Sequence, residues 1–83
     1  MHDLSLALEV CRRAEEIRHQ ADAAGVTALG VEVGSHAGVE LENFRFCLET
    51  LLQDPPFNGT KVELVPVDGD DLRLSWVEVD DGR

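Results

Sequence analysis

The apolar residues of this chain recur with two different periods, and the order of these periods restricts the folds available to it. From residue 4 to residue 24 they fall every three or four positions, on one side of a helix: Leu4, Leu6, Ala7, Val10, Cys11, Ala14, Ile17 and Ala21. This spacing is typical of an amphipathic helix that buries one face. The sequence therefore predicts a helix over Leu4–Ala24, with Asp3 accepting from amides of its first turn and Gly25 ending it.

Three later segments alternate apolar and polar residues, and they predict strands. They are Thr27–Val33, Lys61–Val67 and Leu72–Val79. A period of two is typical of a strand that buries one face. The link Asp68–Asp71 is short and rich in turn residues, so we expect the last two strands to pair as an antiparallel hairpin. In the last strand the apolar face changes between Leu74 and Val77, which predicts a bulge near Ser75 and Trp76.

A second helix is predicted over Glu40–Gln53, where the apolar residues again share one side: Leu41, Phe44, Leu48, Leu51 and Leu52. The segment Asp54-Pro55-Pro56 ends it, because the residue before a proline avoids helical backbone angles and proline has no amide hydrogen. Phe46 falls among the charged residues of this helix. Either another element of the chain or a partner protein is expected to cover such an aromatic side chain.

These elements predict an α+β fold in the order α-β-α-β-β, with two helices packed on one face of a small three-stranded sheet. The chain has 83 residues, which is enough for a single domain over residues 1–83 with a thin core. A thin core and free sheet edges are also compatible with a homodimer.

The charge of the chain argues against two classes of partner. The formal net charge is -10, with 7 Lys and Arg against 17 Asp and Glu. Nucleic acids and anionic membrane surfaces attract basic proteins, so neither is an expected partner. No apolar run approaches the ~20 residues of a membrane span, and the first residues lack the basic and apolar segments of a secretory signal. We therefore expect a cytoplasmic protein.

Cysteine usage and the known catalytic motifs argue against several kinds of chemistry. Cys11 and Cys47 fall within the helical patterns beside apolar residues, which favours buried, reduced thiols, although a disulfide stays open. No CxxC pair is present, so a cysteine-based zinc site is not expected. The sequence also lacks a Gly-x-Ser-x-Gly elbow, a phosphate-binding glycine loop and a His-Glu-x-x-His pair. It predicts a protein that is not an enzyme.

Other polar residues resemble metal ligands only in part. The acidic residues near the end of the chain lack the spacing and the closing Glu of a calcium loop: Asp68, Asp70, Asp71, Asp80 and Asp81. They are expected to be solvated turn and tail charges. His19 lies on the polar side of the first helix and is expected to be solvated. His36 lies in the turn Gly34–Gly38, flanked by glycines, where a functional role stays open.

His2 differs from the other histidines because it adjoins the chain terminus. The amine of Met1, the amide nitrogen of His2 and the Nδ1 atom of the His2 imidazole can close fused five- and six-membered rings around one metal ion. Such a near-planar set of nitrogen donors suits Ni(II) or Cu(II) better than zinc. The first residues are therefore a candidate metal site, although a histidine at position 2 is weak evidence when taken alone.

Several segments of the chain resemble, in the same order, those of one metallochaperone family. The start Met1-His2-Asp3-Leu4-Ser5-Leu6-Ala7 is similar to the Met-His-Glu-Leu-Ser start of the HypA/HybF hydrogenase nickel-incorporation proteins. The stretch ALGVEVGSHAGV is similar to their strand and Gly-x-x-x-Gly-Val turn, and LENFRFCLETLL to their second helix. GTKVELVPV resembles their next strand and GDDLRLSWVEVDD their closing strand. The resemblance covers nearly the whole chain.

The resemblance implies a nickel site at the N-terminus. In the family the terminal amine, the histidine at position 2 and the start of residue 3 bind nickel, which corresponds here to Met1, His2 and Asp3. Asp3 stands where the family has Glu. The turn reads Ser-His-Ala where the family usually has Glu-Leu-Ser, which makes His36 a candidate additional ligand.

One family module is missing from this chain. Family members insert a zinc domain with paired CxxC motifs after the strand that ends here at Pro66, and this chain has only Val67–Asp71 before the last strand. Zinc is therefore not an expected cofactor, whereas Ni(II) is.

The resemblance also implies a function and a choice of partners. It implies a Ni(II)-binding metallochaperone or assembly factor in the maturation of a nickel–iron hydrogenase or another nickel enzyme. The expected partner is the hydrogenase large subunit or a maturation GTPase. The alternative is an adaptor that keeps the HypA-like fold, carries no metal and binds a maturation partner through a sheet edge or Phe46. An acidic surface suits docking on a basic patch in either case.

Overall fold

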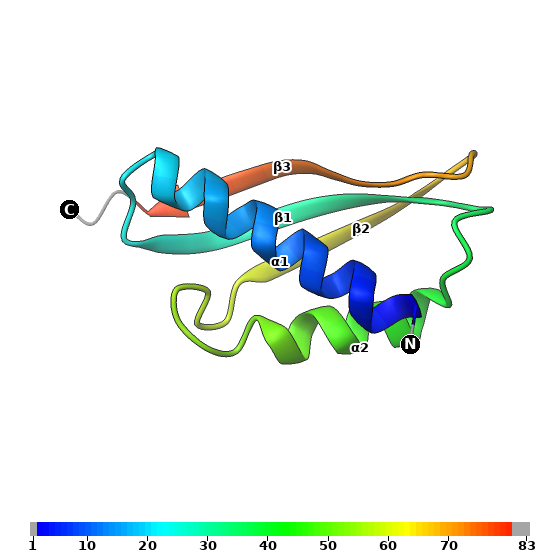
Figure 1. The fold of residues 1–83 in the computed structure, drawn as a ribbon, viewed down its shortest axis with the longest axis horizontal. Coiled ribbons are helices and arrows are strands. Elements are labelled where there is room, and N and C mark those ends of the chain that lie inside the picture. Colours follow the sequence, from blue (N-terminus) through cyan, green and yellow to red (C-terminus); the bar gives the residue numbers. More distant parts are fainter. Residues whose placement is uncertain (1, 81–83) are drawn as a thin grey trace.

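The computed structural model describes residues 2–80, which form two helices and three strands (Figure 1). In chain order these are α1 (His2–Gln20), β1 (Gly25–Gly34), α2 (Leu41–Leu51), β2 (Lys61–Val67) and β3 (Leu72–Asp80). The predicted α+β class and the order α-β-α-β-β are confirmed. Within the described residues, no helix combines the length and the apolar character that a membrane span requires.

The sheet has the strand order β2-β1-β3, so β1 is its central strand. β1 pairs in parallel with β2 and antiparallel with β3. The predicted hairpin between the last two strands is therefore wrong. The link between them, residues 68–71, passes over the end of β1, where Gly34 N donates to Asp71 O at 2.8 Å and His36 N donates to Gly69 O at 2.8 Å.

The length of this link explains why the hairpin prediction failed. Neighbouring strands lie about 4.8 Å apart, so a link that skips one strand must span roughly 10 Å. Each extended residue covers about 3.3 Å, so residues 68–71 are long enough to make the crossing. The same turn-rich composition fits both a hairpin and a crossing. β1 takes the central position with its large apolar side chains on the helix side and small residues, Ala28 and Gly30, on the other.

The core lies between the sheet and the two helices, which pack on the same face of the sheet. It is formed by buried residues from all of these elements: Ala7, Val10, Cys11, Ala14, Leu29, Val31, Val33, Phe44, Leu48 and Leu52. Ala7 and Ala14 are fully buried, and their short side chains allow α1 to lie close to its neighbours. The opposite face of the sheet carries the exposed side chains of Val65 and Trp76.

The predicted bulge in the last strand is present at Ser75. The pairing of β3 with β1 moves from Leu74 to Trp76, so Ser75 is the extra residue. Its hydroxyl donates to Gly30 O at 3.1 Å. The extra residue places Val77 on the same helix-covered side as Leu74, and both pack against the core.

α1 ends earlier than predicted, at Gln20 rather than Ala24. Asp22 adopts a left-handed backbone with φ 55, which stops the helix before Gly25 is reached. Gly25 instead begins β1, and a Cβ atom there would lie 2.7 Å from Pro56 O. Glycine is required at this position for close packing, and it does not end the helix.

α2 agrees with its prediction to within two residues at each end. Glu40 caps it, and its side chain accepts from Glu42 N and Asn43 N. Phe46 is 69% exposed, so the predicted cover by another element is wrong within the described residues. Both cysteines are free thiols, as predicted, with Cys11 buried and Cys47 partly buried.

Candidate functional site

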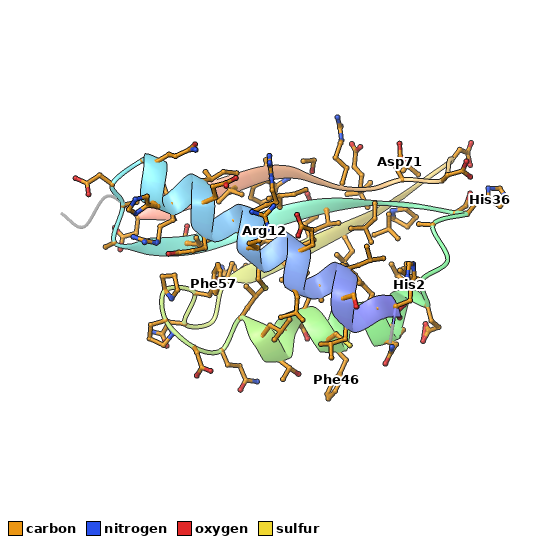
Figure 2. The ribbon with its side chains drawn as sticks, viewed as in Figure 1. His2, Arg12, His36, Phe46, Phe57 and Asp71 are labelled. Carbon is orange, nitrogen blue, oxygen red and sulfur yellow. The ribbon has the colours of Figure 1, made fainter. Side chains whose placement is uncertain are left out.

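The candidate metal site lies where the first turn of α1 meets the β1–α2 connection and the start of α2 (Figure 2). His2 is exposed at this end of the molecule. Its Nε2 atom lies 3.3 Å from Ala37 O, within the connection. A carbonyl oxygen only accepts, so this contact requires Nε2 to carry the proton. In the neutral imidazole, Nδ1 then holds the free lone pair.

The connection passes closely beside the imidazole ring. Gly38 has φ +81, a left-handed backbone that suits glycine, and a Cβ atom there would lie 3.7 Å from His2 Nε2. Backbone atoms of the connection therefore lie beside the ring. This arrangement orients the ring from one side and leaves the rest of it exposed.

Asp3 is buried, with 7% of its surface exposed, and its carboxylate points to α2. Its Oδ2 atom accepts from Glu40 N at 3.3 Å and from Asn43 Nδ2 at 3.0 Å. The prediction that Asp3 accepts from amides of its own helix is therefore wrong, because α1 already begins at His2 and the carboxylate reaches across to the next helix. The negative charge also lies at the positive end of the α2 dipole.

These bonds determine which atoms of Asp3 remain available to a metal ion. The described partners engage Oδ2 in two hydrogen bonds inside the protein. Side-chain ligation would compete with both of them, whereas a main-chain nitrogen contribution from position 3 would disturb neither. Met1, the third predicted ligand, lies outside the described residues.

His36 lies at the outer end of the β1–α2 connection, apart from His2 (Figure 2). Its ring is exposed, and its Nδ1 atom lies 3.3 Å from Ser35 Oγ. The structure therefore brings together His2, Asp3 and the start of α2, and it does not bring His36 to them. Across residues 2–80, no group of three or more His, Cys, Asp or Glu side chains is arranged to hold a metal ion.

Sequence reasoning missed the two groups that hold Asp3. Asn43 lies in the first turn of α2 on its polar side, and nothing in the sequence relates it to Asp3. Glu40 precedes a helix and has a carboxylate that can cap it, which is the only local signal at this point. The contact depends on how the two helices pack, and neither residue alone predicts it.

The thiol of Cys11 lies elsewhere, in the core beneath α1. Burial raises its pKa to about 11, because the thiolate loses its hydration there. A thiol that keeps its proton at neutral pH is a poor nucleophile and a poor metal ligand. This agrees with the prediction that Cys11 is a buried, reduced thiol.

Comparison with known proteins connects this geometry to one family. The family model described as "Hydrogenase/urease nickel incorporation, metallochaperone, hypA" matches residues 1–78. The hydrogenase maturation factor HypA of Azoarcus sp. (strain BH72) is 35% identical over 69 residues, which are 83% of this chain and 60% of that protein. The HypA of Azotobacter vinelandii is 33% identical over 69 residues, again 83% of this chain and 61% of that protein.

The chain thus spans about three fifths of the length of these curated relatives. Its fold is also similar to that of a solved structure, the solution structure of the Ni metallochaperone HypA from Helicobacter pylori. The TM-score is 0.85 at 14% sequence identity, with 96% of this chain and 98% of that chain covered. At 14% identity this similarity shows the fold alone. Membership of the family is shown by the sequence match to the family model and by the curated relatives. The chain belongs to the HypA family.

Proposed function

We propose that this protein binds Ni(II) at its N-terminus and delivers it during the maturation of a nickel–iron hydrogenase or another nickel enzyme. The donors are the amine of Met1 and the amide nitrogen and imidazole of His2, with the main chain of Asp3 completing the set. The protein acts as a cytoplasmic metallochaperone and not as an enzyme. Its partner is the hydrogenase large subunit or a maturation GTPase.

The observation that carries this proposal is the contact between His2 Nε2 and Ala37 O at 3.3 Å. A chelate that joins the terminal amine, the amide of residue 2 and its imidazole closes through Nδ1. The contact leaves the proton on Nε2 and the lone pair on Nδ1, which is the tautomer that such a chelate needs. Hydrogen bonding of the other ring nitrogen is the usual way in which proteins orient a ligating histidine.

The position of Asp3 supports the same donor set. Its carboxylate is held by α2, so the main chain of the first turn is anchored next to the chelating atoms. Preorganisation of this kind reduces the entropy that is lost when the metal binds. A shorter carboxylate than the family's Glu is compatible with this role, because the proposal uses the main chain of position 3.

A second function is favoured by one observation, the exposure of Phe46. An aromatic side chain that is 69% exposed on an otherwise charged helix surface is typical of a partner contact. In this alternative the protein is an adaptor that binds a maturation partner through Phe46 and carries no nickel. The two functions differ in whether the purified protein binds the metal.

The test is a Ni(II) titration of tag-free protein that retains the native Met1. We expect a yellow absorption band, which is characteristic of near-planar nickel bound to nitrogen. The band should disappear in His2→Ala and also when residues are added ahead of Met1, because the amine then becomes a peptide nitrogen. His19→Ala, which changes an exposed histidine on α1, is the matched control and should leave the band unchanged.

Other outcomes would count against the proposal. A band that persists in the N-terminally extended protein would rule out the terminal amine as a ligand. A band that is lost in His36→Ala would add that imidazole to the ligand set. Absence of any band in the native protein would leave the adaptor as the function.

A further inference from the structure

The carbonyl group beside His2 belongs to a segment that is held at both ends. This β1–α2 connection, residues 35–40, runs from the end of β1 past the first turn of α1 to α2 (Figure 1). At the α2 end, Glu40 N donates to Asp3 Oδ2 and Val39 packs against the core. Ala37, whose carbonyl oxygen lies 3.3 Å from His2 Nε2, comes before these contacts. The position of its carbonyl therefore also depends on what holds the β1 end.

The β1 end of the connection is held by the last residue of β2 and by the β2–β3 link, residues 68–71. Three successive amides donate to them, each at 2.8 Å: Gly34 N to Asp71 O, Ser35 N to Val67 O and His36 N to Gly69 O. Ala37 N then donates back to Gly34 O at 3.0 Å and closes a turn. The residue that contacts His2 is thus tied to Gly34, and through Gly34 to the link.

This turn and the link approach each other closely because residue 34 is a glycine. Gly34 is buried, and a Cβ atom there would lie 2.5 Å from Gly69 O and 2.6 Å from Asp71 O. Both obstacles are main-chain atoms, so a side chain at this position would push the link and the turn apart. Close approach of two backbone segments is a usual reason for a glycine.

We propose that the β2–β3 link positions the imidazole of His2 for nickel, with Gly34 as a positioning residue of the site. The inference rests on the proposed nickel binding and extends the site to a segment from the other end of the sequence. The link holds the turn, the turn holds the Ala37 carbonyl, and the carbonyl holds Nε2 so that Nδ1 stays available. Groups that hydrogen-bond a ligating histidine influence metal affinity without touching the metal.

The test compares Gly34→Ala with a control at the opposite end of the same strand. In Gly25→Ala the new Cβ atom would lie 2.7 Å from Pro56 O, which is the same kind of main-chain clash, but away from His2. A further variant, with a pair of glycines inserted between Asp70 and Asp71, loosens the link without adding a clash. It keeps the test open if Gly34→Ala does not fold.

The first measurement needs no metal. A Cβ atom at Gly38 would lie 3.7 Å from Nε2 and 3.8 Å from Cδ2 of His2, so the Gly38 α protons lie near the ring protons. We expect a nuclear Overhauser contact between the His2 ring and Gly38 in the wild-type protein and in Gly25→Ala. It should be lost in Gly34→Ala and weakened in the protein with the longer link.

The second measurement is the Ni(II) dissociation constant of each tag-free protein. Substitutions beside a metal ligand typically weaken binding roughly 10- to 100-fold, and we expect a loss of this size in Gly34→Ala. Gly25→Ala should bind nickel as the wild-type protein does. A purely structural role of Gly34 would lower the stability of both variants and would not separate their nickel affinities.

Several results would overturn the proposal. A ring contact that is retained in both Gly34→Ala and the protein with the longer link would show that the link does not position His2. An equal loss of nickel affinity in Gly25→Ala would assign the effect to general strain, and an equal loss in His36→Ala would assign it to that imidazole. Absence of nickel binding in the wild-type protein would instead contradict the proposed function. The ring contact, measured without metal, would still decide whether the link positions His2.

Discussion

Asn43 Nδ2 donates to Asp3 Oδ2 at 3.0 Å, and this bond joins the first turns of the two helices. The same carboxylate oxygen accepts from Glu40 N, so one buried side chain ties α1 to the start of α2 at two points. Asp3 directly follows His2, the proposed nickel ligand. The stability of the fold and the geometry of the candidate metal site therefore depend on the same contact.

Asn43→Ala should destabilise the fold, because Asn43 donates a hydrogen bond to the buried carboxylate of Asp3. It leaves the buried Asp3 carboxylate with one described bond, and such a loss costs about 1 to 3 kcal/mol. Urea unfolding followed by the fluorescence of Trp76 would measure the change. Glu42→Ala, at the exposed neighbouring position, should change the free energy of unfolding by less than about 0.5 kcal/mol. Equal effects of the two substitutions would show that the bond contributes nothing.

The buried thiol predicts a loss of stability at alkaline pH. Burial raises the pKa of Cys11 to about 11, well above that of a free thiol, so the native state keeps this proton where the unfolded state releases it. Ionisation of this thiol does not affect the free energy of unfolding below about pH 9. As the pH rises towards 11, it lowers the free energy of unfolding by about 2 to 3 kcal/mol. The chain has no tyrosine, which leaves few other groups that titrate in this range.

Urea unfolding under reducing conditions between pH 8 and pH 11 would test this prediction. Cys11→Ala should flatten the alkaline part of the profile, and Cys47→Ala should leave it in place. Alkylation of the native protein at pH 8 should modify Cys47 before Cys11, because Cys47 is only partly buried. Faster modification of Cys11 would contradict its placement in the core.

Gly30→Ala should move the single tryptophan. A Cβ atom at Gly30 would lie 2.1 Å from Trp76 Nε1, closer than any real contact, so the exposed indole must shift. We expect a retained fold, a changed tryptophan emission spectrum and a loss of about 1 kcal/mol, typical of overpacking. In a Trp76→Ala background the same substitution should cost less, and a double-mutant cycle measures the difference. Additive effects would mean that the two residues do not interact.

Arg18→Lys should destabilise the end of α1. The Arg18 guanidinium donates to Glu15 through two nitrogens and to Ala23 O at 2.7 Å, and an ammonium group cannot reproduce this fork. We expect a loss of about 1 kcal/mol in the free energy of unfolding. Arg12→Lys is the matched control, because its fork to Glu9 is exposed and includes no described backbone contact. Its effect should stay below about 0.5 kcal/mol, and a larger effect than that of Arg18→Lys would contradict this reasoning.

Elements with a clear period could be predicted from the sequence, because period reflects burial along a single element. The helices and strands and the bulge at Ser75 are of this kind, whereas the exposure of Phe46 is not, because cover by another element was equally compatible with the pattern. The position of β1 between β2 and β3 is not, because it depends on which strands meet after folding. The turn residues at positions 68–71 are compatible with both a hairpin and a crossing over β1, so they do not decide between them.

Some residues of the candidate site could also be predicted from the sequence, and others could not. His2 and Asp3 could be selected from their place at the chain start and from the resemblance of the whole chain to the HypA family. Their neighbours could not, because Ala37 and Asn43 reach them only through the packing of the β1–α2 connection and α2. Nothing in the local sequence distinguishes a carboxylate that caps its own helix from one that reaches the next.

The central position of β1 has a consequence for how this chain acquires its structure. Both strands that flank β1 follow α2 in the sequence, and the antiparallel partner, β3, is the later of the two. Contacts between segments so distant in sequence slow folding, because a long loop must close before they form. On the ribosome, the sheet cannot be completed until β3 has emerged. We therefore expect this domain to fold in one step after β3 has been synthesised, so that α1 and the candidate metal site at its start become organised only then.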